Sequence, residues 1–490
     1  MDKKETLNGT YPMKWRIFLM TICALSSTQN HCSKDGSNAQ GKKIVIIGAG
    51  LAGLTTGYRL HKKGFNVHIY EARNRVGGRI LSTFVNGNVA ELGGENIADG
   101  GEAENIRQLA QELKLELECL EVFFNHAFHH NGMLLSVDEL IKKHNFNLDT
   151  LQQELYALKG TCASMQEVLD QLFNPDDPLK IYFSSRLAGY EGAPVDQLSS
   201  SYVETLHYMI RRRILHAISA AYQNNETLYT HVKDGNSKLP EALAKQLGEK
   251  VHLAMPLISI TKDKQNQYTL TFKNGFTTTA DILVLTMPCP VYNDITFGET
   301  VIPADRLTAI RSIHNGKNAK ILVPISEESD TSTIFINDQL GIFTFVQKIV
   351  TLYFSGPKSM FSPSTINQTY AQAKSLLAAG GFKQKSVSEQ TPAYARDESF
   401  VSYVGPVGYS WPNDPFAQGT YSYTASGQDA LFTTLQEKDG ITFKTLFAPI
   451  DDTIYFAGEH ASTLFEVPGT MEAACQSGNL AANMIEKLGM

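Results

Sequence analysis

The clearest pattern of apolar and polar positions lies in residues 41–80, GKKIVIIGAGLAGLTTGYRLHKKGFNVHIYEARNRVGGRI. Residues 44–47 form an apolar, β-branched run with the length of a buried strand. A helix-compatible segment follows to about Lys63, and a second apolar run at residues 67–70 ends at Glu71. The order of these segments predicts a strand–helix–strand unit.

Three glycines stand where the first predicted strand turns into the helix, in the spacing Gly48-x-Gly50-x-x-Gly53. Gly48 permits the tight turn, Gly50 lets the backbone approach a pyrophosphate at the helix N-terminus, and Gly53 lets helix and strand pack closely. Glu71, about 20 residues further on, can accept hydrogen bonds from a ribose diol. Strand, glycines, helix, strand and acid in this order predict a dinucleotide-binding unit.

The segment after Glu71 favours a flavin over a nicotinamide. It reads Ala72-Arg73-Asn74-Arg75-Val76-Gly77-Gly78-Arg79. Adjacent glycines bring the backbone close to a ligand, and flanking arginines match phosphate. The alternative is a basic turn between two elements. With the preceding fingerprint, this segment resembles the flavin-containing amine oxidase family, which includes monoamine, polyamine and L-amino acid oxidases.

The C-terminal region carries the same resemblance independently. Residues 454–460, IYFAGEH, resemble the last strand of the family and its flavin-contacting turn, and residues 467–474, VPGTMEAA, resemble the turn and helix start beneath the isoalloxazine. A helix N-terminus at that place can stabilise negative charge on a reduced flavin. The resemblance gives Glu459 to the ribityl chain and Leu257 to the adenine. It implies further cofactor contacts at Gly93, Gly94, Glu95, Asn96, Gly458, Gly469, Thr470 and Met471.

The resemblance implies an α/β fold, α+β overall, of the amine-oxidase and p-hydroxybenzoate-hydroxylase type. A Rossmann-like FAD-binding domain is expected from residues 41–120, 228–307 and 415–490. A discontinuous substrate-binding domain of mixed sheet and helices is expected from residues 121–227, mostly helical in pattern, and from the strand-rich residues 308–414. Within the first domain, residues 268–272 and 282–286 flank Asn274-Gly275 and predict a hairpin.

One lysine of the family is linked through water to flavin N5. Residues 316–323, GKNAKILV, resemble the start of the strand that carries it, and Lys320 stands directly before the apolar run. Lys317 is the competing candidate, and both lysines could instead be solvated. We expect Lys320 to act near the flavin as a desolvated amine.

Residues 418–423, QGTYSY, resemble the segment that supplies a flavin-linking cysteine and a cage tyrosine in monoamine oxidases. Thr420 takes the cysteine position, so the FAD is expected to be non-covalent. Tyr421 takes the tyrosine position, perpendicular to the ring where an amine passes. Thr470 stands at the second tyrosine position, so a two-tyrosine cage is absent.

The expected substrate is a primary amine or a polyamine, oxidised to an imine or aldehyde while O2 is reduced to hydrogen peroxide. Asn96 occupies the position where amino acid oxidases place a carboxylate-binding arginine. Glu95 could attract a second ammonium group or serve as a structural carboxylate. An L-amino acid oxidase remains the alternative, with Arg186 as a candidate carboxylate ligand. A desaturase or protoporphyrinogen-oxidase-like enzyme and a non-catalytic flavin-binding scaffold are further alternatives.

Composition excludes several other classes. The chain has 490 residues, 42% apolar and 19% charged, as in ordinary globular proteins, and its length favours two domains. The net charge is −7 and no basic stripe occurs, which argues against a nucleic-acid partner. The cysteines outside the first 40 residues, Cys119, Cys162, Cys289 and Cys475, are scattered, which favours buried free thiols over a metal site or redox dithiol.

Residues 1–40 are expected to be a leader and linker. Met13, Lys14 and Arg16 precede the apolar residues 17–25 and then small polar residues, a pattern typical of a secretory signal and too short for a membrane span. This pattern favours export, with a leader on a cytoplasmic enzyme as the alternative. A lipid tether at Cys23 or Cys32, a start at Met13 and a homodimer are left open.

Overall fold

The computed structural model describes residues 41–97, 103–120, 125–131, 133–144, 146–218, 229–325, 332–337, 340–346, 348–379, 390–464 and 469–488. The predicted leader, with Cys23 and Cys32, lies outside these residues, as do residues 467 and 468 of the C-terminal motif.

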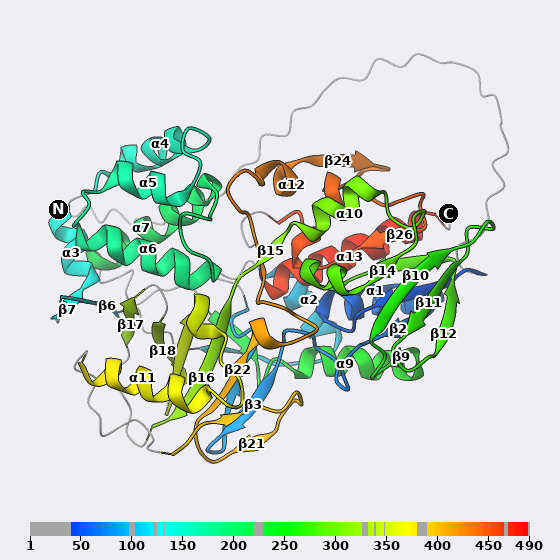
Figure 1. The fold of residues 1–490 in the computed structure, drawn as a ribbon, viewed down its shortest axis with the longest axis horizontal. Helices are drawn as coiled ribbons and strands as arrows, with labels where there is room; N and C mark the ends of the chain where they lie inside the picture. Colours follow the sequence, from blue (N-terminus) through cyan, green and yellow to red (C-terminus); the bar gives the residue numbers. More distant parts are fainter. Residues whose placement is uncertain are drawn as a thin grey trace, which may run out of the picture. The chain divides into compact units, whose positions relative to one another are not determined.

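A five-stranded parallel sheet begins the fold (Figure 1). The predicted strand–helix–strand unit is confirmed as β1 (Lys43–Ile47), α1 (Leu51–Lys62) and β2 (Asn66–Tyr70). The strand order is β26 (Ile454–Phe456), β13 (Ile282–Leu285), β1, β2 and β9 (Val251–His252). The C-terminal strand β26 therefore enters the same sheet as the N-terminal strand, separated from it only by β13.

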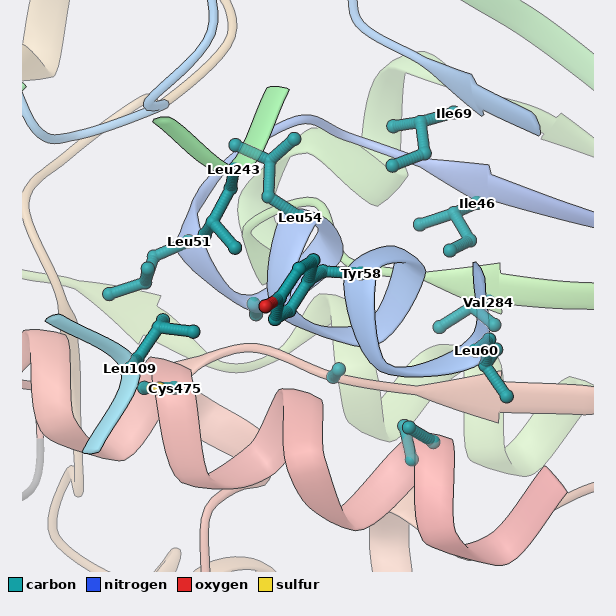
Figure 2. Close-up of a cluster of buried hydrophobic side chains, with 14 of the residues drawn as sticks. Ile46, Leu51, Leu54, Tyr58, Leu60, Ile69, Leu109, Leu243, Val284 and Cys475 are labelled. Atoms are coloured by element: carbon teal, nitrogen blue, oxygen red, sulfur yellow. The ribbon is translucent and has the colours of Figure 1, made fainter. Parts of the chain in front are cut away.

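Helix α1 packs between this sheet and the C-terminal helix α13 (Met471–Lys487), as Figure 2 shows. Leu54 and Leu60 of α1 are fully buried with Ile46 and Ile69 of the strands. Cys475 of α13 belongs to the same cluster, so both ends of the chain share one hydrophobic core.

The first strand and the turn of the predicted hairpin are confirmed, but its second strand is wrong. β11 (Tyr268–Phe272) turns back through Gly275 into β12 (Thr277–Ala280), not into residues 282–286. β12 alternates exposed and buried residues, whereas all of β13 is buried. A continuously apolar strand suits a parallel sheet covered on both faces, which explains why β13 pairs with β1. β10 (Leu257–Lys262) and β14 (Thr296–Phe297) complete this second sheet.

A mixed sheet of eight strands forms the other large layer. Its order is β20 (Ala393–Tyr394), β22 (Val407–Ser410), β16 (Asn318–Pro324), β19 (Ile349–Ser355), β18 (Leu340–Val346), β17 (Ser332–Asn337), β6 (Asn125–His130) and β7 (Met133–Ser136). Residues 125–136 therefore form two strands of this sheet, although they belong to residues 121–227, whose pattern predicts mostly helix. Helix α6 (Pro178–Glu191) packs against β17 and β19.

Within residues 121–227, which the pattern predicts to be mostly helical, residues 148–172 contain the two helices α4 (Leu148–Leu158) and α5 (Met165–Leu172), and Pro178 starts α6. The other α-helices of the described residues are α2 (Glu104–Glu112), α3 (Val137–His144), α7 (Val203–Ile218), α9 (Lys238–Leu247), α10 (Ala304–Arg311), α11 (Ile366–Ala379) and α12 (Asp429–Thr433). The small sheets pair β3 (Ser82–Val85) with β4 (Asn88–Glu91) and β21 (Ser402–Tyr403), β5 (Leu117–Leu120) with β8 (Tyr229–Val232), β15 (His314–Asn315) with β23 (Ser422–Tyr423), and β24 (Leu435–Lys438) with β25 (Ile441–Lys444).

The parallel sheet takes its strands from residues 41–120, 228–307 and 415–490, and the eight-stranded sheet takes its strands from residues 121–227 and 308–414. The exact domain boundaries stay a prediction. Cys162, Cys289 and Cys475 are buried and free. Within the described ranges, no helix is long and apolar enough to cross a membrane.

Candidate active site

One cavity of about 560 Å³ runs from the glycine turn of the parallel sheet to the face of the eight-stranded sheet. Its walls come from segments far apart in the chain, including the turn after β1, the turn after β4, strands β16 and β19, helix α6 and the start of α13. Every predicted site residue except Gly53 lines this cavity.

The glycine turn leaves backbone open to a ligand. Gly48 has φ of +107°, a conformation that favours glycine, and Gly50 precedes α1 without capping its first N–H groups by a side chain. A Cβ on Gly78 would lie 3.2 Å from the Cα of Gly50. Gly53 faces inward instead, where a Cβ would lie 2.1 Å from the carbonyl oxygen of Gly48. The uncapped helix N-terminus is suited to a phosphate.

Glu71 lies buried at the end of β2, beside this turn. Its carboxylate accepts hydrogen bonds from the backbone N–H of Ala49 (2.7 Å) and of Arg73 (2.9 Å), which fix its position at the cavity wall. Carboxylate oxygens can accept further hydrogen bonds, so both remain able to bind hydroxyl groups.

Arg73 is held by carboxylates, although it lines the cavity. Its Nη2 lies 2.5 Å from Asp414 and its Nε lies 3.3 Å from Asp397. Burial alone would lower the pKa of Arg73, but Asp414 and Glu71 outweigh it and raise the pKa. This charge is therefore largely compensated within the protein.

Arg79 and Glu459 form an ion pair across the cavity wall, with Nη1 and Oε1 3.0 Å apart. Arg79 also donates to the carbonyl of Thr420. Ser422 donates to Glu459 through its N–H (2.9 Å) and its hydroxyl (2.7 Å). Burial would raise the pKa of Glu459, but Arg79 and these hydrogen bonds lower it, so the carboxyl is ionised. Glu459 thus links the turn after β26 to Arg79, in the glycine- and arginine-containing segment that follows β2.

Lys320 is buried on β16 and its side chain enters the cavity. Its Nζ donates to the carbonyls of Glu91 and Gly93, both at 3.0 Å, and to Oε2 of Glu95 at 2.9 Å. An ammonium has three N–H donors, and all three are used here. Lys317, by contrast, is exposed and absent from the cavity lining. Glu95 pairs with Lys320, rather than with an arginine or backbone amides.

Tyr421 lies across the turn that begins α13. A Cβ on Gly469 would lie 2.8 Å from the tyrosine ring, so glycine allows the ring to rest there. The ring centroid lies 6.3 Å from that of Tyr190, and the Tyr421 hydroxyl donates to the Tyr190 carbonyl. Burial, together with Tyr353 and Glu191, raises the pKa of Tyr421 well above its usual value, so the phenol stays neutral.

The far wall contains residues that carried no sequence motif. His126 on β6, Arg213 on α7 and Tyr353 on β19 line the cavity together with Arg186 and Tyr190 of α6. The pattern of the chain contained no signal for the first three, because they lie more than 80 residues apart from one another and fall within none of the motifs. Trp411, which donates to the carbonyl of Leu92 (2.9 Å), also lines the cavity.

Leu257 lines the cavity at the start of β10, and Asn96 lines it in the loop after β4. Thr470 caps α13 by accepting a hydrogen bond from the N–H of Ala473 (3.2 Å). Among the described residues, no group of three or more His, Cys, Asp or Glu side chains could hold a metal ion.

Comparisons with known proteins agree with this geometry. Residues 51–485 match the family described as "Flavin containing amine oxidoreductase". Similar curated proteins include the L-amino-acid oxidase of Mus musculus (25% identical, covering 90% of this chain and 70% of that protein) and a probable flavin-containing monoamine oxidase A of Dictyostelium discoideum (24%, 89% and 95%). A lysine-specific histone demethylase 1 homolog 3 of Arabidopsis thaliana is 24% identical over 89% of this chain, which spans 29% of that protein.

Solved structures share the fold. Cyclohexylamine oxidase from Brevibacterium oxydans gives a TM-score of 0.68 at 17% identity, covering 92% of this chain and 100% of that one. Putrescine oxidase bound to putrescine gives 0.67 at 16% identity, covering 91% and 99%. The α/β architecture expected from the sequence is thereby confirmed. With the family match extending over most of its length, this chain belongs to the flavin-containing amine oxidoreductases.

Proposed function

We propose that this protein is an FAD-dependent oxidase of an amine, either a polyamine or a primary amine. The flavin, when bound, supplies two-electron oxidation of the amine to an imine, which hydrolyses to an aldehyde, and reduction of O2 to hydrogen peroxide. The single observation that carries this proposal is the continuity of one cavity from the glycine turn to Lys320 and Tyr421.

The residues present fit an FAD. The uncapped N-terminus of α1 would hold the pyrophosphate and Glu71 the ribose diol, and Gly77 and Gly78 line the same part of the cavity. Gly458, Gly469 and the start of α13 would bound the isoalloxazine, near Lys320. Thr420 offers a hydroxyl and no thiol, which supports non-covalent binding.

The protein side chains then orient the amine and exclude water. Tyr421, with its neutral phenol, would present its ring edge-on to the substrate path beside Tyr190. Lys320 would place its Nζ beside the flavin, held in position by Glu95 and two carbonyls. Because Glu95 is paired with Lys320, it is poorly placed to attract a second ammonium group.

Anaerobic mixing of the purified holoenzyme with pools of monoamines, polyamines and L-amino acids tests this function. We expect an amine pool to bleach the flavin absorbance, and admitted O2 to restore the colour with release of hydrogen peroxide. Bleaching by α-amino acids alone would favour the L-amino acid oxidase alternative. Absence of bleaching by any pool would favour a desaturase-like enzyme or a flavin-binding scaffold.

A further inference from the structure

We propose that Arg186 binds an anionic group of the substrate, so that the substrate is an amine carrying a carboxylate or similar anion at the end remote from the oxidised carbon. This inference rests on the proposed amine oxidation and names its substrate class. It concerns a position on α6, away from the Asn96 position at which amino acid oxidases carry an arginine.

Helix α6 turns one face toward the cavity. Ser185, Arg186, Gly189 and Tyr190 all line it, at the i and i+4 spacing of neighbouring turns. Arg186 stands one turn, about 6 Å, before Tyr190 along the helix axis. Tyr190 in turn contacts the ring of Tyr421, which marks the expected reaction end. The guanidinium bonds the Tyr182 hydroxyl, which belongs to the turn of α6 before Arg186, so we assign the anion subsite to the side of Arg186 away from the Tyr190–Tyr421 contact.

The Arg186 side chain has bonding capacity left for a ligand. Its Nη1 donates to the hydroxyl of Tyr182 at 3.2 Å, and that hydroxyl lies 2.7 Å from Nδ1 of His126. Tyr182 is fully buried, so its hydroxyl is a fixed acceptor that holds one end of the Arg186 guanidinium in position. A guanidinium has five N–H donors, and within the described part of the chain this single hydrogen bond is the one polar contact of Arg186. The remaining donors can form a bidentate pair with a carboxylate.

The charges around the cavity favour an anion there. Lys320 pairs with Glu95 at 2.9 Å, and Arg213 of the far wall lies 3.6 Å from Asp138. Arg186 has no carboxylate partner among the described residues, so it contributes an uncompensated positive charge to this end of the cavity. A second ammonium group, as in a diamine, would be repelled, whereas a carboxylate would be attracted.

A matched set of five-carbon compounds tests the proposal: pentylamine, cadaverine, δ-aminovalerate and norvaline. Anaerobic flavin reduction gives an apparent Kd for each with the wild-type holoenzyme. We expect δ-aminovalerate to have the lowest apparent Kd, and Arg186→Gln to raise that value on the order of 100-fold, at least tenfold more than it raises the apparent Kd of pentylamine. Lys180→Gln is the control, because Lys180 lies on the same helix, pairs with Asp170 and does not line the cavity.

Preference for cadaverine or norvaline, or an equal effect of both variants, would overturn the inference. If none of the compounds reduced the flavin, the oxidase function would fail separately from the subsite. Valerate, which has no amine, then serves as the probe through perturbation of the flavin spectrum. Binding of valerate to wild type and Lys180→Gln, but not to Arg186→Gln, would support the subsite. Equal binding to all three would reject it.

Discussion

Lys320 is the buried charge on which the proposed chemistry depends most directly. Substitution Lys320→Met removes the ammonium from the cavity and leaves the Glu95 carboxylate without its partner. We expect turnover per bound flavin to fall on the order of 100-fold, as when a preorganised charged group is lost from a desolvated site. Stopped-flow measurement of flavin reduction and reoxidation, normalised to flavin content, checks this prediction.

The control for that measurement is Lys317→Met, which changes an exposed lysine at the entry of the same strand. It should leave both half-reactions unaltered. Equal rates for wild type and Lys320→Met would show that Lys320 has a structural role alone. Its three hydrogen bonds to the protein would then account for that role.

Glu191, at the end of α6, carries a buried carboxyl beside Tyr202. Burial raises its pKa to about 8, although the hydrogen bond with Tyr202 opposes this shift. The unfolded chain loses this proton near pH 4.5, so the folded state binds more protons between about pH 5 and 8. The contribution of Glu191 to stability is therefore complete at low pH and is lost as the pH rises toward 8.

Substitution Glu191→Gln keeps a neutral side chain at every pH and should remove this dependence. The unfolding free energy of the variant relative to wild type should rise with pH, by at most about 1.4 kcal/mol per unit. Urea unfolding at pH 5.5 and pH 8 measures the difference. Parallel stability profiles for the two proteins would contradict a raised pKa.

At the scale of single elements, strand β13 shows where sequence patterns are ambiguous. Both residues 277–280 and 282–285 follow the Asn274-Gly275 turn at hairpin distance. The first segment alternates in burial and forms the hairpin, while the second is wholly buried and joins β1 and β26. Periodicity distinguishes the two only when the four threonine and alanine positions of β12 are recognised as a strand of their own.

Helix α1 depends on a glycine that does not touch the cavity. A Cβ at Gly53 would lie 2.1 Å from the Gly48 carbonyl oxygen, so Gly53→Ala must push α1 away from the turn. We expect a loss of about 1–3 kcal/mol in unfolding free energy, as for overpacking, together with lower flavin content. Denaturant unfolding and the flavin-to-protein absorbance ratio measure the two effects.

Gly41→Ala provides the comparison, because a Cβ there meets no atom within 4 Å. It should match wild type in both stability and flavin content. If Gly53→Ala also matched wild type in stability and flavin content, the hypothesis that α1 needs glycine at this position for close packing against the turn would be wrong.

At the scale of the whole molecule, the two halves of the cavity differ in how far the sequence predicts them. The half expected to hold the cofactor consists of short contiguous motifs whose glycines and acids have a fixed spacing, so residues 48–53, 71–79, 454–460 and 469–471 could be predicted as cofactor contacts from the sequence alone. The half expected to hold the substrate is assembled from single side chains of β6, α6, α7 and β19. No local pattern marks His126, Arg213 or Tyr353, because only the tertiary fold brings them to one wall.

The mode of cofactor attachment depends on the entire lining of this cavity. A thioether link to a flavin needs a cysteine thiol at the isoalloxazine. The described lining residues include none, and the described free cysteines, Cys162, Cys289 and Cys475, lie outside it. At the position of the linking cysteine, the Thr420 hydroxyl lies 2.8 Å from Oδ1 of Asn318 and 2.9 Å from the carbonyl oxygen of Gly316.

Acid precipitation of the holoenzyme should therefore release all of the flavin into the supernatant, where its absorbance and mass identify intact FAD. Thr420→Cys is an informative partner variant, since it places a thiol where the family resemblance expects the link. Yellow colour that stayed with the precipitated wild-type polypeptide would contradict non-covalent binding. Because release requires only unfolding, this outcome tests the cavity lining independently of whether any amine is oxidised.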